Sequence, residues 1–242
     1  MLRRAAAIHY TTAEERRLAE DSLQLARGVV IPLGIETEHL QTRESSSVFR
    51  RQHPVVDHAP YVLVLSRIHP KKGLELLLET FLDLVRQPRF KQWKLVVAGE
   101  GDARYVTSLR RQVQESGSND HVLFSGWLAD REKISALQDA ALLALPSYQE
   151  NFGVCIAEAL ACGVPVLVSR HVNLAREIEA AGAGWIAAME PDDFREKLAQ
   201  ALEMKEERAR RGEAGREFVD RFLKWPTVAA DLITLYRSLI EA

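Results

Sequence analysis

From Tyr61 onward the sequence alternates short apolar runs with longer amphipathic stretches. Each run is three to five residues long and almost continuously apolar. This pattern is typical of strands that are covered on both faces, as in a parallel sheet. The runs are Tyr61–Leu65, Lys94–Ala98, Val122–Phe124, Ala141–Leu145, Val164–Val168 and Gly184–Ala188. The alternation of strands with helices predicts an α/β fold with an open, doubly wound, parallel six-stranded sheet.

Helices are predicted between these strands. Apolar residues in the stretch 74–85 recur at spacings of three and four, which is the helical pattern. The other predicted helices are Ala103–Glu115, Arg131–Asp139, Val154–Ala161, Asn173–Ala180 and Asp192–Met204. The last stretch, 206–242, predicts two extra C-terminal helices broken near Trp225 and Pro226, because proline is tolerated in the first turn of a helix.

The first 34 residues do not fit the repeat. They predict a strand, a helix and a strand at Ala5–Tyr10, Ala13–Ala26 and Val29–Pro32. One β-α-β unit cannot bury enough surface to fold alone, so we expect it to pack on the main domain or a partner, or to stay loose. Residues 35–59 are polar, include serines at 45–47, and predict a linker. The expected divisions are 1–34, a linker at 35–59, a main domain at 60–222 and a C-terminal helix at 223–242.

Composition excludes several classes of protein. Lys plus Arg number 32 and Asp plus Glu number 34, and this net charge of −2 argues against a nucleic-acid partner. No apolar run approaches the ~18 residues of a membrane-spanning helix. Cys155 and Cys162 lie seven positions apart in one predicted helix, too far apart for a disulfide. A reduced, cytoplasmic protein is therefore expected.

Ligands of open parallel sheets bind beyond the carboxyl ends of the strands, so the residues after each run are the candidate site. The first run is followed by Ser66 and Arg67, and then by Lys72 at the start of a helix. Two cations beside free backbone N–H groups suit a diphosphate. The alternative is a solvated basic turn with a helix cap.

Glycines follow the second and third runs. Gly99 and Gly101 allow a sharp turn and close approach of a ligand, although a plain turn is the alternative and the six-residue dinucleotide pattern is absent. Gly126 and Trp127 place backbone near an aromatic base. We favour a backbone role there, since Trp127 could equally be a packing residue.

The segment after the fourth run holds two glutamates eight positions apart. Glu150 lies in the predicted loop, and Glu158 lies in an otherwise apolar helix, where a carboxylate is costly without partners. The vicinal hydroxyls of a ribose are such partners. The alternatives are that Glu158 caps local amides or pairs with Arg67 or Lys72. Between the glutamates, Phe152, Gly153 and Val154 offer free N–H groups to an anion.

These motifs resemble the group 1, or family four, retaining glycosyltransferases, which have the GT-B fold. Glu150 and Glu158 match the family's Glu-x7-Glu motif, and Arg67 with Lys72 matches its arginine and lysine pair. The segments Gly99–Gly101, Asn151–Gly153 and Ile31–Ile35 are also similar to family segments. The chain resembles the C-terminal, donor-binding half of such an enzyme, a Rossmann-like domain.

The resemblance implies roles for these positions. Arg67 and Lys72 would hold the diphosphate and stabilise the leaving nucleotide, and no metal or other cofactor would be required. Glu158 would accept from the ribose, and Glu150 would bind the transferred sugar. The remaining expected donor contacts are Ser66, Gly99, Gly101, Gly126, Trp127, Asn151, Phe152, Gly153 and Val154.

The sequence also departs from the family pattern. By this resemblance the chain would begin inside the last β-α-β unit of the acceptor domain, so the chain alone is expected to bind nucleotide-sugar weakly and to transfer poorly. We assign no catalytic role to His9, and Ser66 stands where many members have glycine. The resemblance does not identify the acceptor, which is expected to be a polysaccharide, a lipid-linked sugar or a small molecule. A lipid-linked acceptor would imply peripheral contact with the inner membrane face. The alternatives are a non-catalytic nucleotide-sugar-binding module that needs a partner chain, and a phosphorylase-like or epimerase-like enzyme.

Overall fold

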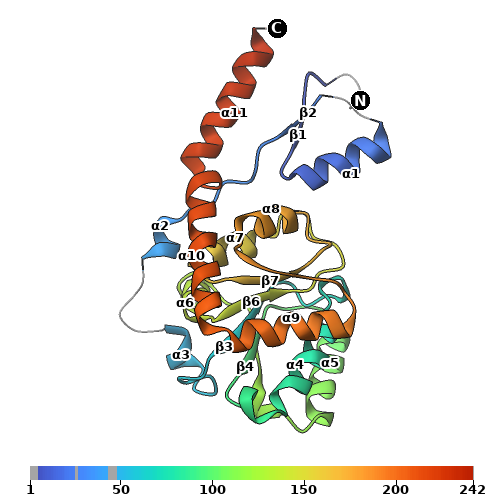
Figure 1. The fold of residues 1–242 in the computed structure, drawn as a ribbon, viewed down its shortest axis with the longest axis vertical. Helices are drawn as coiled ribbons and strands as arrows, with labels where there is room; N and C mark the ends of the chain where they lie inside the picture. Colours follow the sequence, from blue (N-terminus) through green and yellow to red (C-terminus); the bar gives the residue numbers. More distant parts are fainter. Residues whose placement is uncertain (1–4, 25–26, 43–47, 242) are drawn as a thin grey trace.

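The computed structural model describes residues 5–24, 27–42 and 48–241, which form one large and one small sheet (Figure 1). All strand pairs of the large sheet are parallel, in the order β5-β4-β3-β6-β7-β8. Its strands are β3 (Tyr61–Leu65), β4 (Lys94–Ala98), β5 (Val122–Gly126), β6 (Leu142–Leu145), β7 (Val166–Ser169) and β8 (Gly184–Ala187). The predicted α/β fold with a six-stranded parallel sheet is confirmed.

Helices cover both faces of this sheet. Residues of α4, α5 and α9 belong to one hydrophobic core, and residues of α6, α7, α8 and α10 belong to the other. The helices are α4 (Leu74–Val85), α5 (Ala103–Glu115), α6 (Asp130–Asp139), α7 (Val154–Ala161), α8 (Ala175–Ala181), α9 (Pro191–Glu203), α10 (Lys205–Phe222) and α11 (Trp225–Ile240). The two last helices meet where the sequence predicts, with Pro226 in the first turn of α11.

Strand β3 shows why the apolar runs lack alternation. Val62 and Val64 enter one core, whereas Tyr61 and Leu63 enter the other. All four side chains are fully buried. Because successive side chains of a strand point to opposite faces, a sheet covered on both sides needs apolar residues at every position.

The strand order reverses between β3 and β6. The chain builds outward from β3 through β4 to β5, returns to β6 beside β3, and builds outward again through β7 to β8. At such a switch point the connections leave toward opposite faces, and a crevice opens beyond the carboxyl ends of the strands. The loops that begin there are 66–73 and 146–153, the two loops that hold the predicted cations and the first predicted glutamate.

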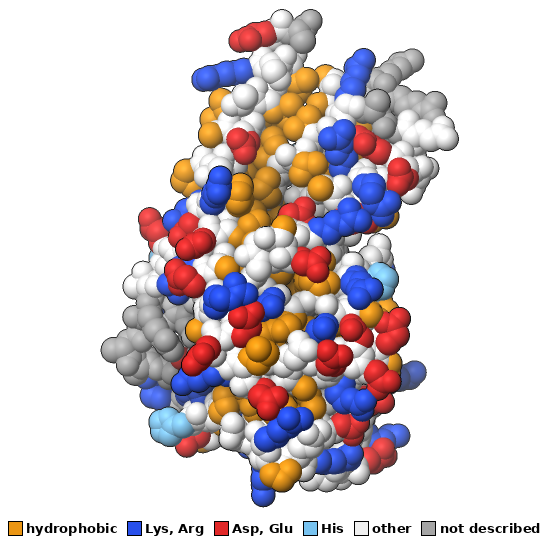
Figure 2. Space-filling view, in the orientation of Figure 1, with side chains coloured by type: hydrophobic (Ala, Val, Ile, Leu, Met, Phe, Trp, Pro, Cys, Tyr) orange, Lys and Arg blue, Asp and Glu red, His pale blue; other side chains and the backbone are white. Residues whose placement is uncertain are grey.

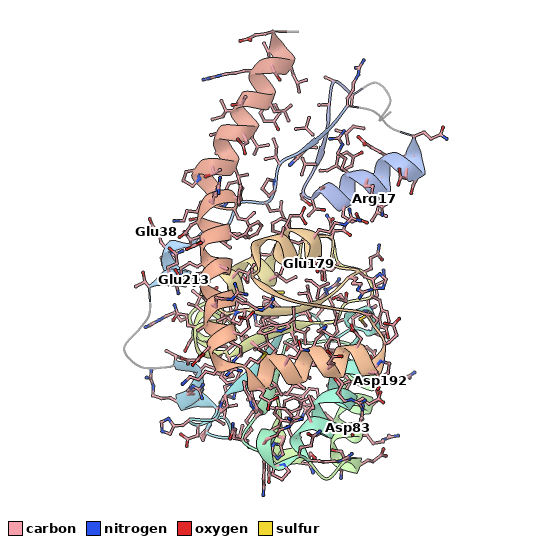
Figure 3. All side chains as sticks on the ribbon, viewed as in Figure 1. Arg17, Glu38, Asp83, Glu179, Asp192 and Glu213 are labelled. Carbon is pink, nitrogen blue, oxygen red and sulfur yellow. The ribbon has the colours of Figure 1, made fainter. Side chains whose placement is uncertain are left out.

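The first 34 residues form a separate small unit. Strands β1 (Ile8–Tyr10) and β2 (Gly28–Val30) pair in parallel, and α1 (Ala13–Leu23) joins them. Figure 3 shows Arg17 on α1 above Glu179 on α8. The two helices are connected by an ion pair in which Arg176 Nη1 lies 3.6 Å from Glu14 Oε2. We call residues 5–34 the N-terminal unit.

The segment 35–59 joins this unit to the sheet, and its described parts pack against the main domain. It includes α2 (Glu38–Gln41) and α3 (Val48–Gln52), and it adds Ile35, Leu40, Phe49 and Val56 to one hydrophobic core. The Phe49 ring lies 5.7 Å from that of Tyr61, centroid to centroid. The serines at 45–47 lie outside the described residues. Buried residues therefore anchor both described parts of the predicted linker, 35–42 and 48–59, in the core.

The chain enters and leaves the main domain at one place. The Ile35 N–H donates to the carbonyl of Leu223 at 2.7 Å, just before α11 begins. A Cβ atom on Gly34 would lie 2.4 Å from the Trp225 indole, so this close crossing requires glycine. In Figure 1, α11 continues past the crossing toward the upper end of the molecule, the end at which β1 and β2 also lie.

Hydrophobic side chains are exposed on this upper part of the molecule. Figure 2 shows hydrophobic atoms grouped where α11 and the N-terminal unit lie. The exposed apolar residues of these elements include Leu18, Val30, Leu33, Ile233, Tyr236 and Ile240. None of the helices in the described ranges combines the length and apolar character that a bilayer crossing requires.

Candidate functional site

The loops after β3 and β4 run side by side because two glycines let their backbones touch. Gly99 has φ 137°, and a Cβ there would lie 1.9 Å from the carbonyl oxygen of Ser66. A Cβ on Gly101 would meet the carbonyl of Ile68 at the same distance. The pairing continues as a parallel bridge between Ile68 and Gly101. These glycines therefore act on the shape of the site, by bringing the second loop against the first.

A cavity of about 500 Å³ lies beyond the carboxyl ends of β3 and β4. The residues that line it are Leu65, Ser66, Arg67, Ala98, Gly99, Trp127, Leu128, Ala129, Asp130, Lys133, Cys155 and Glu158. Five predicted site residues are thus on its wall: Ser66, Arg67, Gly99, Trp127 and Glu158. Trp127 is 70% exposed, so its indole is not a core packing residue.

Arg67 is a cationic residue of the cavity wall whose guanidinium is available to a ligand. Its side chain is exposed, and among the described residues its guanidinium has no hydrogen-bond or ion-pair partner. An arginine without a protein partner keeps all its donors for an anionic ligand.

Lys72 and Glu150 lie next to one another and form an ion pair. Lys72 ends a short 3-10 turn, and Glu150 lies in the loop between β6 and α7. Their side chains are 17% and 18% exposed. Gly73, which follows the lysine, allows the loops to approach, because a Cβ there would lie 2.1 Å from the carbonyl oxygen of Pro146.

Glu158 has a different partner from those we considered. Lys133 Nζ on α6 lies 2.8 Å from Glu158 Oε1 on α7, and the two side chains are 31% and 17% exposed. The ion pair with Arg67 or Lys72 is therefore absent from the described contacts. Lys133 is a site residue that the sequence motifs do not predict. Its only signal was a lysine in an amphipathic stretch, 25 positions before the glutamate.

The start of α7 lies beside Glu150. Gly153 has φ 70° and precedes the helix, and a Cβ there would lie 3.3 Å from Glu150 Cγ. The first N–H groups of a helix have no partner further back within it, and in this first turn the Ile156 N–H donates to the Gly153 carbonyl at 2.8 Å. Phe152 is buried and fixes the loop in the core. The predicted anion-binding amides are thus close to the predicted sugar-binding carboxylate.

Cys155 lies on the cavity wall, and the charges of both glutamates act on its thiol. It is a free thiol that lines the cavity. Burial raises its pKa to about 12, the charges of Glu150 and Glu158 add to the rise, and Lys72 opposes it. The thiol therefore stays protonated near neutral pH.

Other predicted residues lie outside the cavity wall. Gly126 has φ 79° and open space around it, and its carbonyl accepts from the Gly99 N–H at 2.8 Å. The Asn151 side chain is bonded to Thr11, Glu15 and Asn173. In the described ranges, His, Cys, Asp and Glu form no group of three that could hold a metal ion, and the expectation that none is needed stays a prediction.

A sequence profile of the family described as "Glycosyl transferases group 1" matches residues 45–218. The chain belongs to this family. The resemblance found in the motifs is thereby confirmed. The group 1 chain is 28% identical over 216 residues to the GDP-mannose-dependent alpha-(1-6)-phosphatidylinositol monomannoside mannosyltransferase of Mycobacterium tuberculosis. The match covers 86% of this chain and 55% of that enzyme.

Solved structures share the fold. Sucrose-phosphate synthase from Thermosynechococcus elongatus superposes with a TM-score of 0.84 at 24% identity, over 99% of this chain and 60% of the other. The Anabaena protein HepE, solved with UDP-glucose, gives a TM-score of 0.84 at 22% identity, over 98% of this chain and 65% of the other. The chain spans 55% to 65% of the length of these proteins, and its six-stranded parallel sheet with flanking helices matches these GT-B glycosyltransferase structures in fold.

Proposed function

We propose that this chain is the donor-binding part of a glycosyltransferase that moves a hexosyl group from a nucleotide-diphosphate sugar to an acceptor hydroxyl with retention. The observation that supports this best is the meeting of Arg67, Lys72, Glu150 and Glu158 around the switch point of the sheet. The cavity beside them is large enough for a nucleoside. The names of relatives agree with such a donor, since one is GDP-mannose-dependent and another was solved with UDP-glucose.

In this proposal each charged group has one task. Arg67 and Lys72 bind the diphosphate and stabilise the negative charge that develops on the leaving nucleotide. Lys72 exchanges its contact with Glu150 for a phosphate oxygen. The freed Glu150 accepts from hydroxyls of the transferred sugar, and the first amides of α7 help to hold that sugar.

The nucleoside occupies the cavity. Glu158 accepts from the ribose hydroxyls, and Lys133 orients that carboxylate through their ion pair. The base lies toward Trp127, an exposed residue of the cavity wall, and toward Gly126, which precedes it just outside that wall. The two cations neutralise the diphosphate directly, so binding is expected to be the same in EDTA as in magnesium.

Calorimetric titration tests the proposal. We expect GDP-mannose or UDP-glucose, together with the matching nucleoside diphosphate, to bind at millimolar concentration or tighter. Absence of binding by GDP, UDP and both sugars would reject it. The anomeric configuration of the product, read by NMR after the acceptor half is supplied, tests retention.

The alternative function is a nucleotide-sugar-binding module without catalysis. Both functions require donor binding, so titration alone does not separate them. Sugar transfer after addition of the N-terminal half of a family member separates them, because a module without catalysis would yield no product. We place the protein in the cytoplasm, in line with its two free cysteines.

A further inference from the structure

Asn151 uses both ends of its side-chain amide in contacts with other segments. Its nitrogen lies 3.2 Å from Thr11 Oγ1 and 3.0 Å from Glu15 Oε1. Its oxygen accepts from Asn173 Nδ2 at 2.9 Å. Thr11 and Glu15 belong to the N-terminal unit, whereas Asn173 follows β7. We call these four residues the Asn151 network.

Glu15 is equally committed. Its other oxygen, Oε2, accepts from the Thr11 N–H at 2.6 Å and from the Thr11 hydroxyl at 2.7 Å. One carboxylate therefore faces the turn before α1 with one oxygen and the Glu150 loop with the other. The polarity of every contact is fixed, since a carboxylate only accepts and the amide nitrogen only donates.

Backbone hydrogen bonds hold Glu150, the residue next to Asn151. The Glu150 N–H donates to the carbonyl of His171 at 3.2 Å, and the Glu150 carbonyl accepts from the Asn173 N–H at 2.9 Å. These bonds fix the loop to the segment after β7 on one side. The Asn151 side chain fixes the same loop to α1 on the other side, 136 positions away in the chain.

We infer that Asn151 is a positioning residue through which the N-terminal unit sets the place of Glu150 in the donor site. Because its amide is committed to the network, Asn151 acts on the sugar through the neighbouring carboxylate. The inference rests on the proposed function, in which Glu150 meets the transferred sugar. It makes the orientation of the N-terminal unit a determinant of sugar binding and leaves the nucleotide contacts untouched.

A reciprocal exchange of amide and carboxylate tests this. Asn151→Asp sets two carboxylates about 3.0 Å apart at the Glu15 contact. Glu15→Gln sets two amide nitrogens against each other. The double variant restores a donor facing an acceptor, because the new amide at position 15 can donate to the new carboxylate at position 151 while its oxygen still accepts from Thr11. Both substitutions keep the size and shape of the side chain.

The ligand measurement compares a nucleotide-sugar with its nucleoside diphosphate. In the full chain, each single variant should lose about threefold to tenfold in affinity for GDP-mannose or UDP-glucose, with GDP or UDP affinity unchanged. The double variant should regain the original affinity. Glu20→Gln removes a charge from α1 outside the network and should change neither value. If Asn151 contacts the sugar directly, Glu15→Gln has no effect and the double variant is not rescued, which overturns the inference.

A second measurement needs no ligand. Hydrogen–deuterium exchange of peptides covering 148–153 and 171–174 should be faster in each single variant and return to the original rate in the double variant. Unchanged exchange in the single variants would overturn the inference. A chain that binds no nucleotide at all would reject the proposed function instead, while the exchange rates still decide whether the network holds the loop.

Discussion

Lys72 and Glu150 are ion-paired across the switch point of the sheet although 78 positions separate them in the chain. The pair joins the loop after β3 to the loop after β6. Both side chains are mostly buried. Removal of either one would leave the charge of the other without a partner. In the proposed function, a phosphate that binds Lys72 would free Glu150, which would couple diphosphate binding to sugar binding.

Lys72→Met should weaken binding of a nucleoside diphosphate by ~1.5–3 kcal/mol, because a hydrogen bond to a charged group is lost. Calorimetry with GDP, UDP and the matching nucleosides measures this, and nucleoside affinity should not change. Lys71→Met is the matched control. Lys71 is an exposed neighbour that bonds Gln149 at 3.3 Å, and its loss should leave both affinities unchanged.

The same substitution should also lower the free energy of unfolding, by about 1 kcal/mol, since it leaves the Glu150 charge unpaired. Adding Glu150→Gln should restore stability in chemical denaturation without restoring diphosphate affinity. Equal losses of nucleoside and diphosphate affinity in Lys72→Met would indicate misfolding and contradict the assigned contact.

Glu158→Gln should remove the preference for ribose. An amide accepts more weakly than a carboxylate, so affinity for GDP or UDP should fall about tenfold, while the 2′,3′-dideoxy nucleotides and pyrophosphate bind as before. Competition titrations give these ratios. Glu132→Gln on α6, whose carboxylate contacts His53 Nε2 at 2.9 Å, is the control with no expected effect on ligands.

The Cys155 thiol should react slowly with iodoacetamide at pH 8. Its pKa is raised to about 12, so the reactive thiolate is scarce well below pH 12, and the rate should climb with pH throughout that range. Unfolding in urea removes the burial and should accelerate the reaction. Quenched samples analysed by mass spectrometry give the rates, and fast alkylation of the folded chain at pH 8 would contradict the raised pKa.

Gly212→Ala should destabilise the fold by about 1–3 kcal/mol. A Cβ at this position of α10 would lie 2.0 Å from the carbonyl oxygen of Gly163, at the contact between α10 and α7. Helix propensity alone predicts the opposite sign, a gain of about 1 kcal/mol. Urea denaturation measures the change. Glu213→Ala, at the next and exposed position, should be nearly neutral, and a stabilised Gly212 variant would refute the close approach.

The sheet could be predicted because its signals are local. Each strand is a short apolar run, and the bounds of β3 and β4 are those predicted. Helix α4 could be predicted equally well from its apolar residues at spacings of three and four. Nine of its twelve residues are buried. The order of the strands follows from general rules for α/β folds. This order in turn places Lys72 near Glu150.

The side-chain partners could not be predicted, because they depend on which helix faces which. Lys133 lies on α6 and meets Glu158 on α7, and nothing in either segment specifies the other. The contact of Asn151 with Glu15 spans 136 positions. The packing of segment 35–59 was missed for a related reason: its buried anchors, such as Phe49 and Val56, are too widely spaced to form a periodic pattern.

The crossing of Ile35 with Leu223 gives the main domain an entry and an exit that touch. A fold whose ends meet can be grafted into a surface loop of a host protein without pulling that loop apart. Residues 35–223 are therefore a suitable segment for circular permutation or for insertion between two fluorescent reporters. In such a chimera, the nucleotide binding that we propose would be measured as a change in fluorescence.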